Sequence, residues 1–415
     1  MGGALKNSSN PASYLGAIFL GCSSKTGQRS YRLFQNAMKR ILVTGGAGFI
    51  GSYLCRTLSG QGWEVTALDN LSPQVHGTDP KIDLPKDVNF IRGDVCCEAD
   101  LERALDGQEV VVHLAAETGT GQSMYELLRY EQVNVRGTAL LMHTLLRQSA
   151  KSVKKVVVAS SRAIYGEGAN LCPIHGVVYP KPRALEDMAE RRFEPRCPRC
   201  QAFCEPFPTD EDCPSSPTSY YGITKQAQEQ TVLTLARSLG ISAYALRYQN
   251  VYGPGQSLKN PYTGILAVFS NLARSNQTIN VFEDGLESRD FVYVEDVVDA
   301  TMRCIDRPGV FVDRFNVGSG ERITVEQVAR KVAAYFESSS TVEISGDFRQ
   351  GDIRHNVADL THVKETLGYR PRWSFTEGVS EFLRWASLHE QTESGFNRSM
   401  DELKARGLLF SVSAK

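Results

Sequence analysis

The sequence predicts an α/β protein in which a doubly wound parallel sheet carries a smaller C-terminal lobe. From Arg40 on, short runs of β-branched residues alternate with segments of helical periodicity, a pattern typical of a parallel sheet covered by helices. Apolar residues make up 41% and charged residues 22% of the 415 residues, as in ordinary globular proteins. Beyond about residue 253, loops rich in Gly, Pro and Asn replace the alternation, which predicts a lobe over the carboxyl edge of the sheet.

The predicted strands are residues 41–43, 65–68, 88–91, 110–114, 156–159 and 243–246. We expect residues 38–252 to form the sheet domain, with a Cys-rich insertion at 167–214. Residues 253–390 are expected to form mainly the smaller, substrate-binding lobe, and residues 391–415 a polar tail with a loosely attached helix.

Residues 1–37 contain neither Asp nor Glu and surround a short apolar run at 14–22 with Ser, Lys and Arg. Three interpretations remain open for this N-terminal extension. It could be an organellar transit peptide, a weak export signal, or a segment upstream of a true start at Met38, which directly precedes the first predicted strand.

Charge and hydropathy argue for a small-molecule partner. The net charge is -1 and no long basic stripe is present, so the electrostatic signature of a nucleic-acid binder is missing. The longest apolar stretches, such as 139–142, are far shorter than the roughly 20 residues that span a bilayer. We therefore expect a cytoplasmic protein that binds neither a nucleic acid nor a membrane.

The first predicted strand runs into a glycine-rich segment, TGGAGFIGS at 44–52, and a helical pattern follows at once. Gly46 and Gly48 would let the backbone turn tightly and approach a pyrophosphate, and Gly51 would let the strand and the helix pack closely. The helix N-terminus would offer free N–H groups to the phosphates. This arrangement is the Rossmann fingerprint of a dinucleotide-binding site.

Asp69 ends the next predicted strand, 18 residues after Gly51. Its carboxylate could accept hydrogen bonds from both adenosine ribose hydroxyls, whereas the 2′-phosphate of NADP would meet a like charge. The pattern therefore favours NAD. A turn or cap aspartate would fit the residue type but not this position.

Tyr221 and Lys225 lie four residues apart in a helical pattern and so share one face. A phenol with a pKa of about 10 is a poor base at neutral pH, but a nearby ammonium and a positive nicotinamide ring would favour the phenolate. Tyr-x-x-x-Lys alone is common on surface helices. It gains weight here because Ser160 and Ser161 follow the strand 156–159 at the carboxyl edge, where ligands of doubly wound sheets bind.

In order and spacing, the motifs resemble those of the extended short-chain dehydrogenase/reductases in the nucleotide-sugar epimerase/dehydratase family, over residues 39 to about 388. They are the glycine loop at 45–51, GDV at 93–95, HLAA at 113–116, SS at 160–161, Tyr221 with Lys225, LRYQNVYGP at 246–254, RDFV at 289–292 and RQGD at 349–352.

This resemblance implies NAD as cofactor, a nucleotide sugar as substrate and a homodimer formed through a four-helix bundle. It implies that Ser161 holds the reacting sugar oxygen while Tyr221 and Lys225 act as the catalytic pair, and that Asp94 contacts the adenine. The expected cofactor-binding residues are Gly45, Gly48, Phe49, Ile50, Gly51, Asp69, Asn70, Asp94, Val95, Leu114, Ala115, Ala116, Tyr221 and Lys225. The expected substrate-binding residues are Ser161, Asn250, Arg289, Arg349 and Asp352.

Relatives that dehydrate a sugar carry an acidic pair just after the catalytic hydroxyl residue, because loss of water needs an acid and a base at neighbouring carbons. Here those positions hold Arg162 and Ala163. What remains is oxidation at one carbinol and return of the hydride to the opposite face of a 4-keto sugar. Segments 115–124, 161–168 and 255–264 resemble a bacterial subgroup typified by dTDP-L-rhamnose 4-epimerases, so we expect that type of C4 epimerisation.

Two alternatives remain at this point. The chain could be another UDP-, dTDP- or GDP-sugar 4-epimerase or a 4-ketosugar reductase. From a different class, it could be a non-catalytic, NAD-bound redox sensor that signals through its Cys-rich insertion. The intact set of Ser161, Tyr221 and Lys225 argues against the sensor.

The Cys-rich insertion makes the link between Tyr165 and Tyr221 about 30 residues longer than is usual in the family. It contains Cys172-x-x-His175 and Cys197-x-x-Cys200, a spacing typical of tetrahedral structural zinc. In a reducing cytoplasm a disulfide explains such pairs less well. We expect one zinc on these four residues, with Cys204 and Cys213 as spares. The alternative is a set of unligated loop cysteines.

Overall fold

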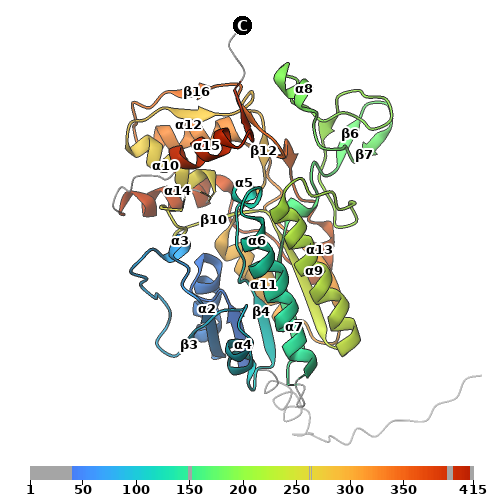
Figure 1. Cartoon of the computed structure of the whole chain (residues 1–415), viewed down its shortest axis with the longest axis vertical. Coiled ribbons are helices and arrows are strands. Elements are labelled where there is room, and N and C mark those ends of the chain that lie inside the picture. The colour runs from blue at the N-terminus through green and yellow to red at the C-terminus, as the bar shows by residue number, and fades with distance from the viewer. Residues whose placement is uncertain (1–39, 148–151, 261, 263, 390–395, 412–415) are drawn as a thin grey trace, which may run out of the picture. The chain divides into compact units, whose positions relative to one another are not determined.

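The structure, a computed structural model, describes residues 40–147, 152–260, 262, 264–389 and 396–411. The N-terminal extension of residues 1–37 and Met38 lie outside the described residues. Figure 1 shows the arrangement of the elements along the chain.

A seven-stranded sheet is the core of the structure. Its strands are, in spatial order, β14 (Val312–Val317), β9 (Ser242–Tyr248), β5 (Lys155–Ser161), β4 (Val110–His113), β1 (Arg40–Thr44), β2 (Glu64–Asp69) and β3 (Asn89–Arg92). Every neighbouring pair runs parallel. The chain adds β2 and β3 on one side of β1 and the later strands on the other. The order thus reverses between β1 and β4, where ligands of such sheets bind outside the carboxyl ends of the strands.

Each strand predicted from the sequence corresponds to a strand of this sheet, which confirms the doubly wound fold class. The seventh strand, β14, comes from residues that the sequence assigned mainly to the C-terminal lobe. It pairs with β9 from Val312↔Ala243 to Val317↔Tyr248. The chain therefore returns from the lobe to complete the sheet.

Helices cover both faces of the sheet. α4 (Glu98–Leu105), α7 (Gly137–Arg147) and α9 (Tyr220–Leu239) share one hydrophobic cluster with strand residues such as Val156. The next residue back along β5, Lys155, points to the opposite face and donates hydrogen bonds to the Cys304 and Ile305 carbonyls in α11 (Val294–Asp306). α11 therefore lies on the second face and contacts α2 (Phe49–Gly60). No helix within the described ranges is long and apolar enough to cross a membrane.

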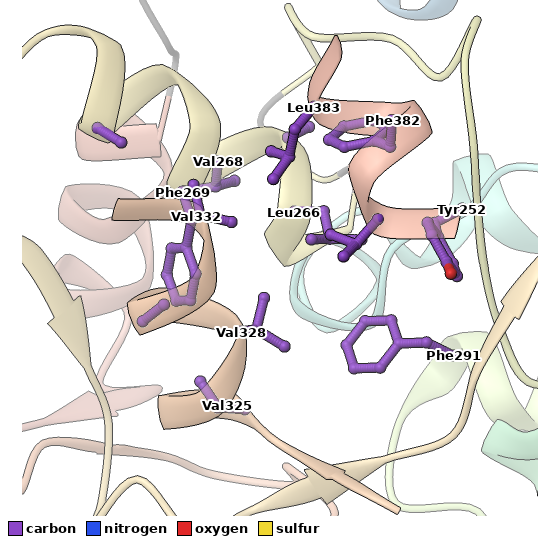
Figure 2. Packing of buried hydrophobic residues seen from close by; sticks show 14 of the residues in the cluster. Tyr252, Leu266, Val268, Phe269, Phe291, Val325, Val328, Val332, Phe382 and Leu383 are labelled. Atoms are coloured by element: carbon purple, nitrogen blue, oxygen red, sulfur yellow. The ribbon is translucent and has the colours of Figure 1, made fainter. Parts of the chain in front are cut away.

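The C-terminal lobe is built around one apolar cluster, shown in Figure 2. α10 (Ile265–Arg274), α12 (Val325–Tyr335) and α14 (Phe375–Ser387) pack their buried faces into it. Capping boxes at Thr324 and Ser374 start α12 and α14 by satisfying free backbone N–H groups. Short strand pairs complete the lobe: β10 (Asn250–Tyr252) with β13 (Phe291–Tyr293), β11 (Ile279–Val281) with β16 (Val342–Ile344), and β12 (Ser288–Arg289) with β15 (Ile323–Thr324) and β18 (His355–Asn356).

The polar tail is attached more firmly than the sequence predicts. After α15 (Phe396–Ala405), β19 (Leu409–Phe410) pairs antiparallel with β17 (Phe348–Arg349). Leu403 of α15 is buried. The tail helix expected to be loose is thus part of the lobe, because a few apolar residues find partners far away in the sequence.

The Cys-rich insertion has a small sheet of its own, in the order β7 (Gly176–Val178), β6 (Asn170–Cys172), β8 (Glu205–Pro206), with both pairings antiparallel. One short helix, α8 (Leu185–Ala189), follows β7. The remaining connections include α3 (Pro73–His76), α5 (Thr120–Ser123), α6 (Leu127–Tyr130), a π-helical turn (Glu131–Arg136), the 3₁₀ helix η3 (Arg162–Ile164) and α13 (Thr361–Leu367).

Candidate active site

The glycine-rich segment that leads from β1 into α2 has no room for side chains at Gly45 and Gly51. A Cβ on Gly51 would lie 2.1 Å from the Gly45 carbonyl oxygen, and one on Gly45 would lie 2.9 Å from the Ala115 nitrogen. Gly45 also has a φ of 69°, which other L-residues rarely adopt. The loop is thereby pressed against β4 and the helix, with the N-terminus of α2 facing the cleft as a phosphate site requires.

Asp69 lies at the end of β2 and is largely buried. Its carboxylate accepts hydrogen bonds from the backbone nitrogens of Ala47, at 3.1 Å, and Leu71, at 2.9 Å. His76 Nε2 lies 3.6 Å from the same carboxylate. The Asp69 side chain therefore orders the glycine loop as well as facing the cleft, a second role that sequence reasoning did not identify.

Two cavities follow the carboxyl ends of β1, β2 and β4. One, of about 190 Å³, lies beside Asp69 and Asp94, and the other, of about 350 Å³, extends to Tyr221 and Lys225. Gly45, Leu114 and Ala116 line both, so the two form one groove. Between them they contain every residue predicted to bind the cofactor.

Tyr221 and Lys225 are placed by the first turns of α9. Ser219 caps this helix by accepting a hydrogen bond from the Gly222 nitrogen, and the Tyr221 nitrogen donates to Ser123 Oγ of α5 at 2.9 Å. Lys225 Nζ donates to the Ala159 carbonyl at 2.9 Å and lies 6.0 Å from the centre of the Tyr221 ring. Both side chains are thus fixed at the carboxyl end of β5.

The electrostatics of this pair differ from the sequence expectation. Burial raises the pKa of Tyr221, while the Ser161 hydroxyl and the charge of Arg162 oppose that rise. Burial also lowers the pKa of Lys225 to about 7. The ammonium is bonded to a carbonyl and not to the phenol, so the protein's own groups do not bring the phenol into the neutral range.

A further cavity of about 320 Å³ lies under the C-terminal lobe and contains all residues predicted to bind the substrate. Ser161, Tyr221 and Asn250 line both this cavity and the large dinucleotide groove. Ser160, in contrast, donates a hydrogen bond to Glu229 at 2.6 Å. The structure thus brings the Ser161 and Tyr221 side chains to the junction of the two spaces.

Two arginines converge on one carboxylate at the far side of this cavity. Asp352 lies 2.6 Å from Arg349 and 3.4 Å from Arg289, which also pairs with Glu287 at 3.3 Å. Although burial alone would raise the pKa of Asp352, the two guanidinium charges hold it below its ordinary value. Cationic groups held in this way form a site suited to a diphosphate.

Three further residues in or beside this cavity were not identified from the sequence as functional. Arg162 is partly buried and donates from Nε to Asn250 at 2.6 Å, while its buried Nη1 has no hydrogen-bond partner among the described residues. Glu287 follows no known motif, but it lies two residues before Arg289, and that proximity could have identified it. Glu402 of α15 accepts hydrogen bonds from Tyr125, at 2.9 Å, and from Tyr262, at 3.2 Å, and Tyr262 lines the cavity.

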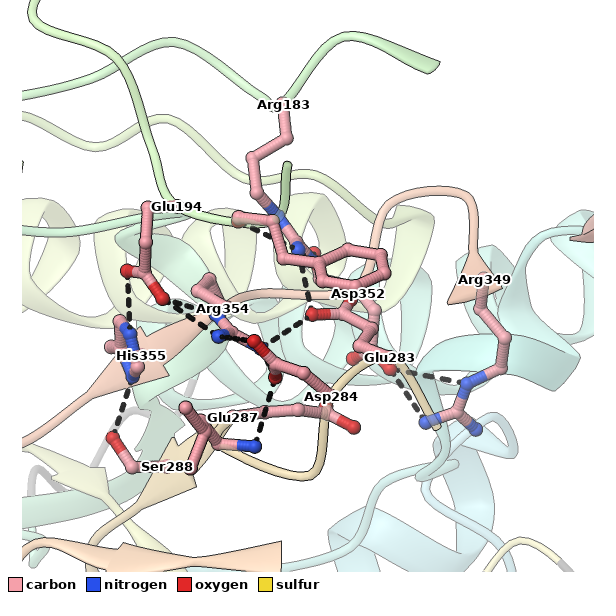
Figure 3. A network of polar contacts seen from close by, with 12 residues as sticks. Arg183, Glu194, Glu283, Asp284, Glu287, Ser288, Arg349, Asp352, Arg354 and His355 are labelled. Carbon is pink, nitrogen blue, oxygen red and sulfur yellow. Dashed lines mark hydrogen bonds and ion pairs between the residues drawn. The ribbon is translucent and has the colours of Figure 1, made fainter. Parts of the chain in front are cut away.

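The Cys-rich insertion contacts the segment that carries the arginines (Figure 3). Arg183 forms ion pairs with Glu167, at 3.2 Å, and Glu283, at 2.8 Å, and donates to the Asp352 carbonyl. Glu194 pairs with Arg354 at 2.7 Å. The structure also brings the four residues predicted to bind zinc together within this insertion, outside the cavities described above.

Comparison with known families gives one match that covers most of the sheet and part of the lobe. The model of the NAD dependent epimerase/dehydratase family matches residues 41–184 and 200–318. The unmatched residues 185–199 lie within the Cys-rich insertion. The insertion thus interrupts a pattern that is otherwise continuous from β1 to β14.

Similar proteins act on several sugars. The chain is 38% identical to a dTDP-L-rhamnose 4-epimerase from Burkholderia thailandensis, over 84% of this chain and 94% of the relative. It is 32% identical to a UDP-glucose 4-epimerase from Mycolicibacterium smegmatis, over 83% of this chain and 98% of the relative.

Solved structures agree with this picture. A UDP-glucose 4-epimerase from Thermotoga maritima, solved with UDP-glucose, has a TM-score of 0.68 at 29% identity and covers 84% of this chain and 99% of its own. MoeE5 in complex with UDP-glucuronic acid and NAD has a TM-score of 0.67 at 28% identity, with the same coverage. On its motifs, its sheet and these matches, the chain belongs to the NAD dependent epimerase/dehydratase family.

Proposed function

We propose that this protein epimerises C4 of a nucleotide-linked hexose of the dTDP-L-rhamnose type, through a transient 4-keto sugar. One observation carries this proposal: Ser161 and Tyr221 lie where the dinucleotide groove meets a cavity that ends in two arginines. A nucleotide sugar with its diphosphate at Arg289 and Arg349 would present its hexose to these two side chains. The higher identity to the dTDP-L-rhamnose enzyme than to the UDP-glucose enzyme supports the sugar type.

In the proposed reaction, Ser161 donates a hydrogen bond to the reacting oxygen and Tyr221 accepts the proton of the C4 hydroxyl. Bound NAD supplies a reversible hydride acceptor, and its positive ring also favours the phenolate that burial disfavours. Tyr221 returns the proton after the sugar has turned over. Lys225 bonds to the Ala159 carbonyl and so holds its face of α9 against β5. Its ammonium keeps a positive charge beside the Tyr221 ring.

The cavity offers no acid and base pair for dehydration. The carboxylates among its lining residues, Glu287 and Asp352, both pair with arginines at the diphosphate end. The positions after Ser161 hold Arg162, which is bonded to Asn250, and Ala163. Chemistry at a single carbinol therefore fits these residues better than loss of water.

The test is to incubate the protein with dTDP-, UDP- and GDP-sugars and to follow the anomeric and C4 proton signals by NMR. We expect interconversion of a dTDP-linked 6-deoxyhexose and its C4 epimer without added NAD, because an epimerase regenerates its own cofactor. A stoichiometric change in NADH would indicate a 4-ketosugar reductase instead. Binding of NAD without turnover of any sugar would favour the redox sensor.

We also propose that the protein is a cytoplasmic homodimer. α7 and α9 lie side by side and expose Leu146, at 44%, and Ile223, at 48%. The cysteines in the described part of the chain form no disulfide with one another, which suits a reducing compartment. Light scattering should give twice the chain mass, and Leu146→Lys should shift it towards the monomer.

A further inference from the structure

Four side chains of the Cys-rich insertion converge on one point. The ligand atoms of Cys172, His175, Cys197 and Cys200 all lie within 4.8 Å of one another. His175 Nδ1 is 3.7 Å from Cys172 Sγ and 3.5 Å from Cys197 Sγ, and the sulfurs of Cys172 and Cys200 are 3.6 Å apart. Tetrahedral zinc with Zn–S of about 2.3 Å and Zn–N of about 2.0 Å has ligand–ligand edges of about 3.5–3.8 Å.

The backbone around each cysteine pair adopts the same turn. The Ile174 nitrogen donates to Cys172 Sγ at 3.4 Å, and the Arg199 nitrogen donates to Cys197 Sγ at 3.5 Å. In both cases the donor is two residues after the sulfur that accepts. Such N–H···S bonds orient a ligand sulfur and stabilise its thiolate form. Two separate segments thus present matching knuckles to one centre.

The part of the insertion around these four residues has only a small core. Its buried cluster consists of Val178 and cysteines alone, with Cys172 and Cys197 almost fully buried. The rest of the insertion is held by contacts with the lobe, such as the cluster of Met188 and Phe193 with Phe348. A core as small as the cysteine cluster does not hold its part of the chain without a staple. A single disulfide would connect two of the four groups and leave the histidine and the remaining thiol without a reason to converge.

We propose that Cys172, His175, Cys197 and Cys200 bind one zinc ion in a closed structural site. Three sulfurs and one imidazole nitrogen are a typical zinc donor set, and they fill all four positions of the tetrahedron. The site lies outside the cavities that contain Tyr221 and the arginines, so the metal takes no part in the sugar chemistry.

The metal site is close in the chain to a contact with the segment that follows Arg349 and Asp352. Glu194 precedes Cys197 by three residues and pairs with Arg354, and it also lies 2.9 Å from His355 Nε2. Loss of zinc should therefore loosen the segment with Arg349 and Asp352 and raise the KM for the sugar more than it lowers kcat. This consequence rests on the proposed function, whereas the metal content does not.

The test is elemental analysis of the untagged full chain, which should contain about one zinc per chain. Cys197→Ser combined with Cys200→Ser should reduce zinc to background. Cys204→Ser is the matched control, because Cys204 is buried in the same cluster but its thiol donates to the Ala202 carbonyl. His175→Cys should retain zinc through a fourth thiolate, whereas His175→Ala should lose most of it at low free zinc.

Several outcomes would overturn the site. One is a zinc content well below one per chain in freshly purified protein. The others are a zinc content of the double variant equal to that of the wild type, and loss of zinc in Cys204→Ser. A chain mass two hydrogens lower, without metal, would show a disulfide instead. If Co²⁺ replaces zinc, the intense visible d–d bands of a tetrahedral thiolate site should appear in His175→Cys and not in the double variant. None of these measurements depends on turnover, so failure of the proposed function would leave the result intact.

Discussion

The two cations beside the Tyr221 phenol are both bonded elsewhere. Lys225 donates to the Ala159 carbonyl and Arg162 donates to Asn250. Burial raises the pKa of the phenol, and the Ser161 hydroxyl and the charge of Arg162 oppose that rise. In the proposed reaction, Tyr221 would therefore stay protonated until the positive nicotinamide ring is bound beside it.

Tyr221→Phe should keep the fold and the cofactor and lose most turnover. General base catalysis typically increases the rate about 10²–10⁴-fold. Among the described residues, no carboxylate or imidazole lines the junction at Ser161 and could replace the phenol. The measurement is the epimerisation rate by NMR together with the NAD content of the purified variant. Retention of near wild-type turnover would show that another group is the base. In D₂O, the C4 hydrogen should stay on the sugar.

Asp69→Asn should narrow the preference for NAD over NADP. The asparagine keeps one acceptor oxygen, for either the Ala47 or the Leu71 nitrogen, so the loop keeps one of its two hydrogen bonds to this side chain while the negative charge is lost. A charge opposing a phosphate at a partly exposed site contributes on the order of 1 kcal/mol, or about fivefold in the ratio of the two Kd values. Calorimetry with both cofactors measures this ratio, with the exposed Asp79→Asn as control. Equal affinities in the wild type would refute the role of Asp69.

Glu287 should make substrate binding depend on pH. Burial, followed by the charges of Glu283 and Asp352, raises the pKa of Glu287 to about 7. Above that pH the carboxylate neutralises part of the Arg289 charge, so the KM for the nucleotide sugar should rise as pH increases through about 7. The same shift means that Glu287 contributes less to folding stability as pH rises from its ordinary 4.5 towards 7.

The matched variants are Glu287→Gln, which should remove this step in KM, and the exposed Glu343→Gln, which should keep it. The measurement is KM between about pH 6 and pH 8 at saturating NAD. A KM that falls with rising pH, or a step that persists in Glu287→Gln, would assign the titration to another group.

At the scale of elements, prediction from the sequence succeeded where the signal is local. The strand and the glycine loop at 40–51 and the helix with Tyr221 are each encoded in a continuous stretch. The tail was misjudged because its contacts are distant: α15 is mostly polar, and its Glu402 meets Tyr125 and Tyr262 only in the folded chain. The dinucleotide groove, the cavity under the C-terminal lobe and the junction between them likewise depend on contacts between strands that no single segment encodes.

Removal of residues 396–415 should therefore open the substrate cavity and leave the cofactor groove intact. Ser399, Met400 and Leu403 line the substrate cavity and neither cavity of the groove, and β19 supports Arg349 through β17. Loss of these contacts, of the order of 1–2 kcal/mol, should raise the KM about tenfold while NAD content stays the same. Removal of 412–415 alone is the control. An unchanged KM in the longer truncation would show that α15 is not part of the binding wall.

At the scale of the whole molecule, a buried ion-pair network joins the Cys-rich insertion to the lobe. Arg354 is fully buried and pairs with Glu194 of the insertion and with Glu283 and Asp284 of the lobe (Figure 3). Arg183 reaches from the insertion to Glu283 and to the Asp352 carbonyl. The insertion thus supports the end of the cavity that carries Arg289 and Arg349, although its residues 185–199 lie outside the region matched by the family model.

Arg183→Met should destabilise the protein by about 3–5 kcal/mol, because it leaves the buried carboxylates of Glu167 and Glu283 without their shared partner. Burial already raises the pKa of Glu167 in the intact network. Without Arg183 that pKa should rise further, so the loss of stability should be larger at high pH than at low pH, where the carboxyl can take up a proton. Urea unfolding of the holoprotein at two pH values measures both effects, and the exposed Arg199→Met in the same insertion is the control. A loss of unfolding free energy equal to that of the control would contradict the stabilising role of the network. A loss that grows as the pH falls would contradict the assignment of the titration to Glu167.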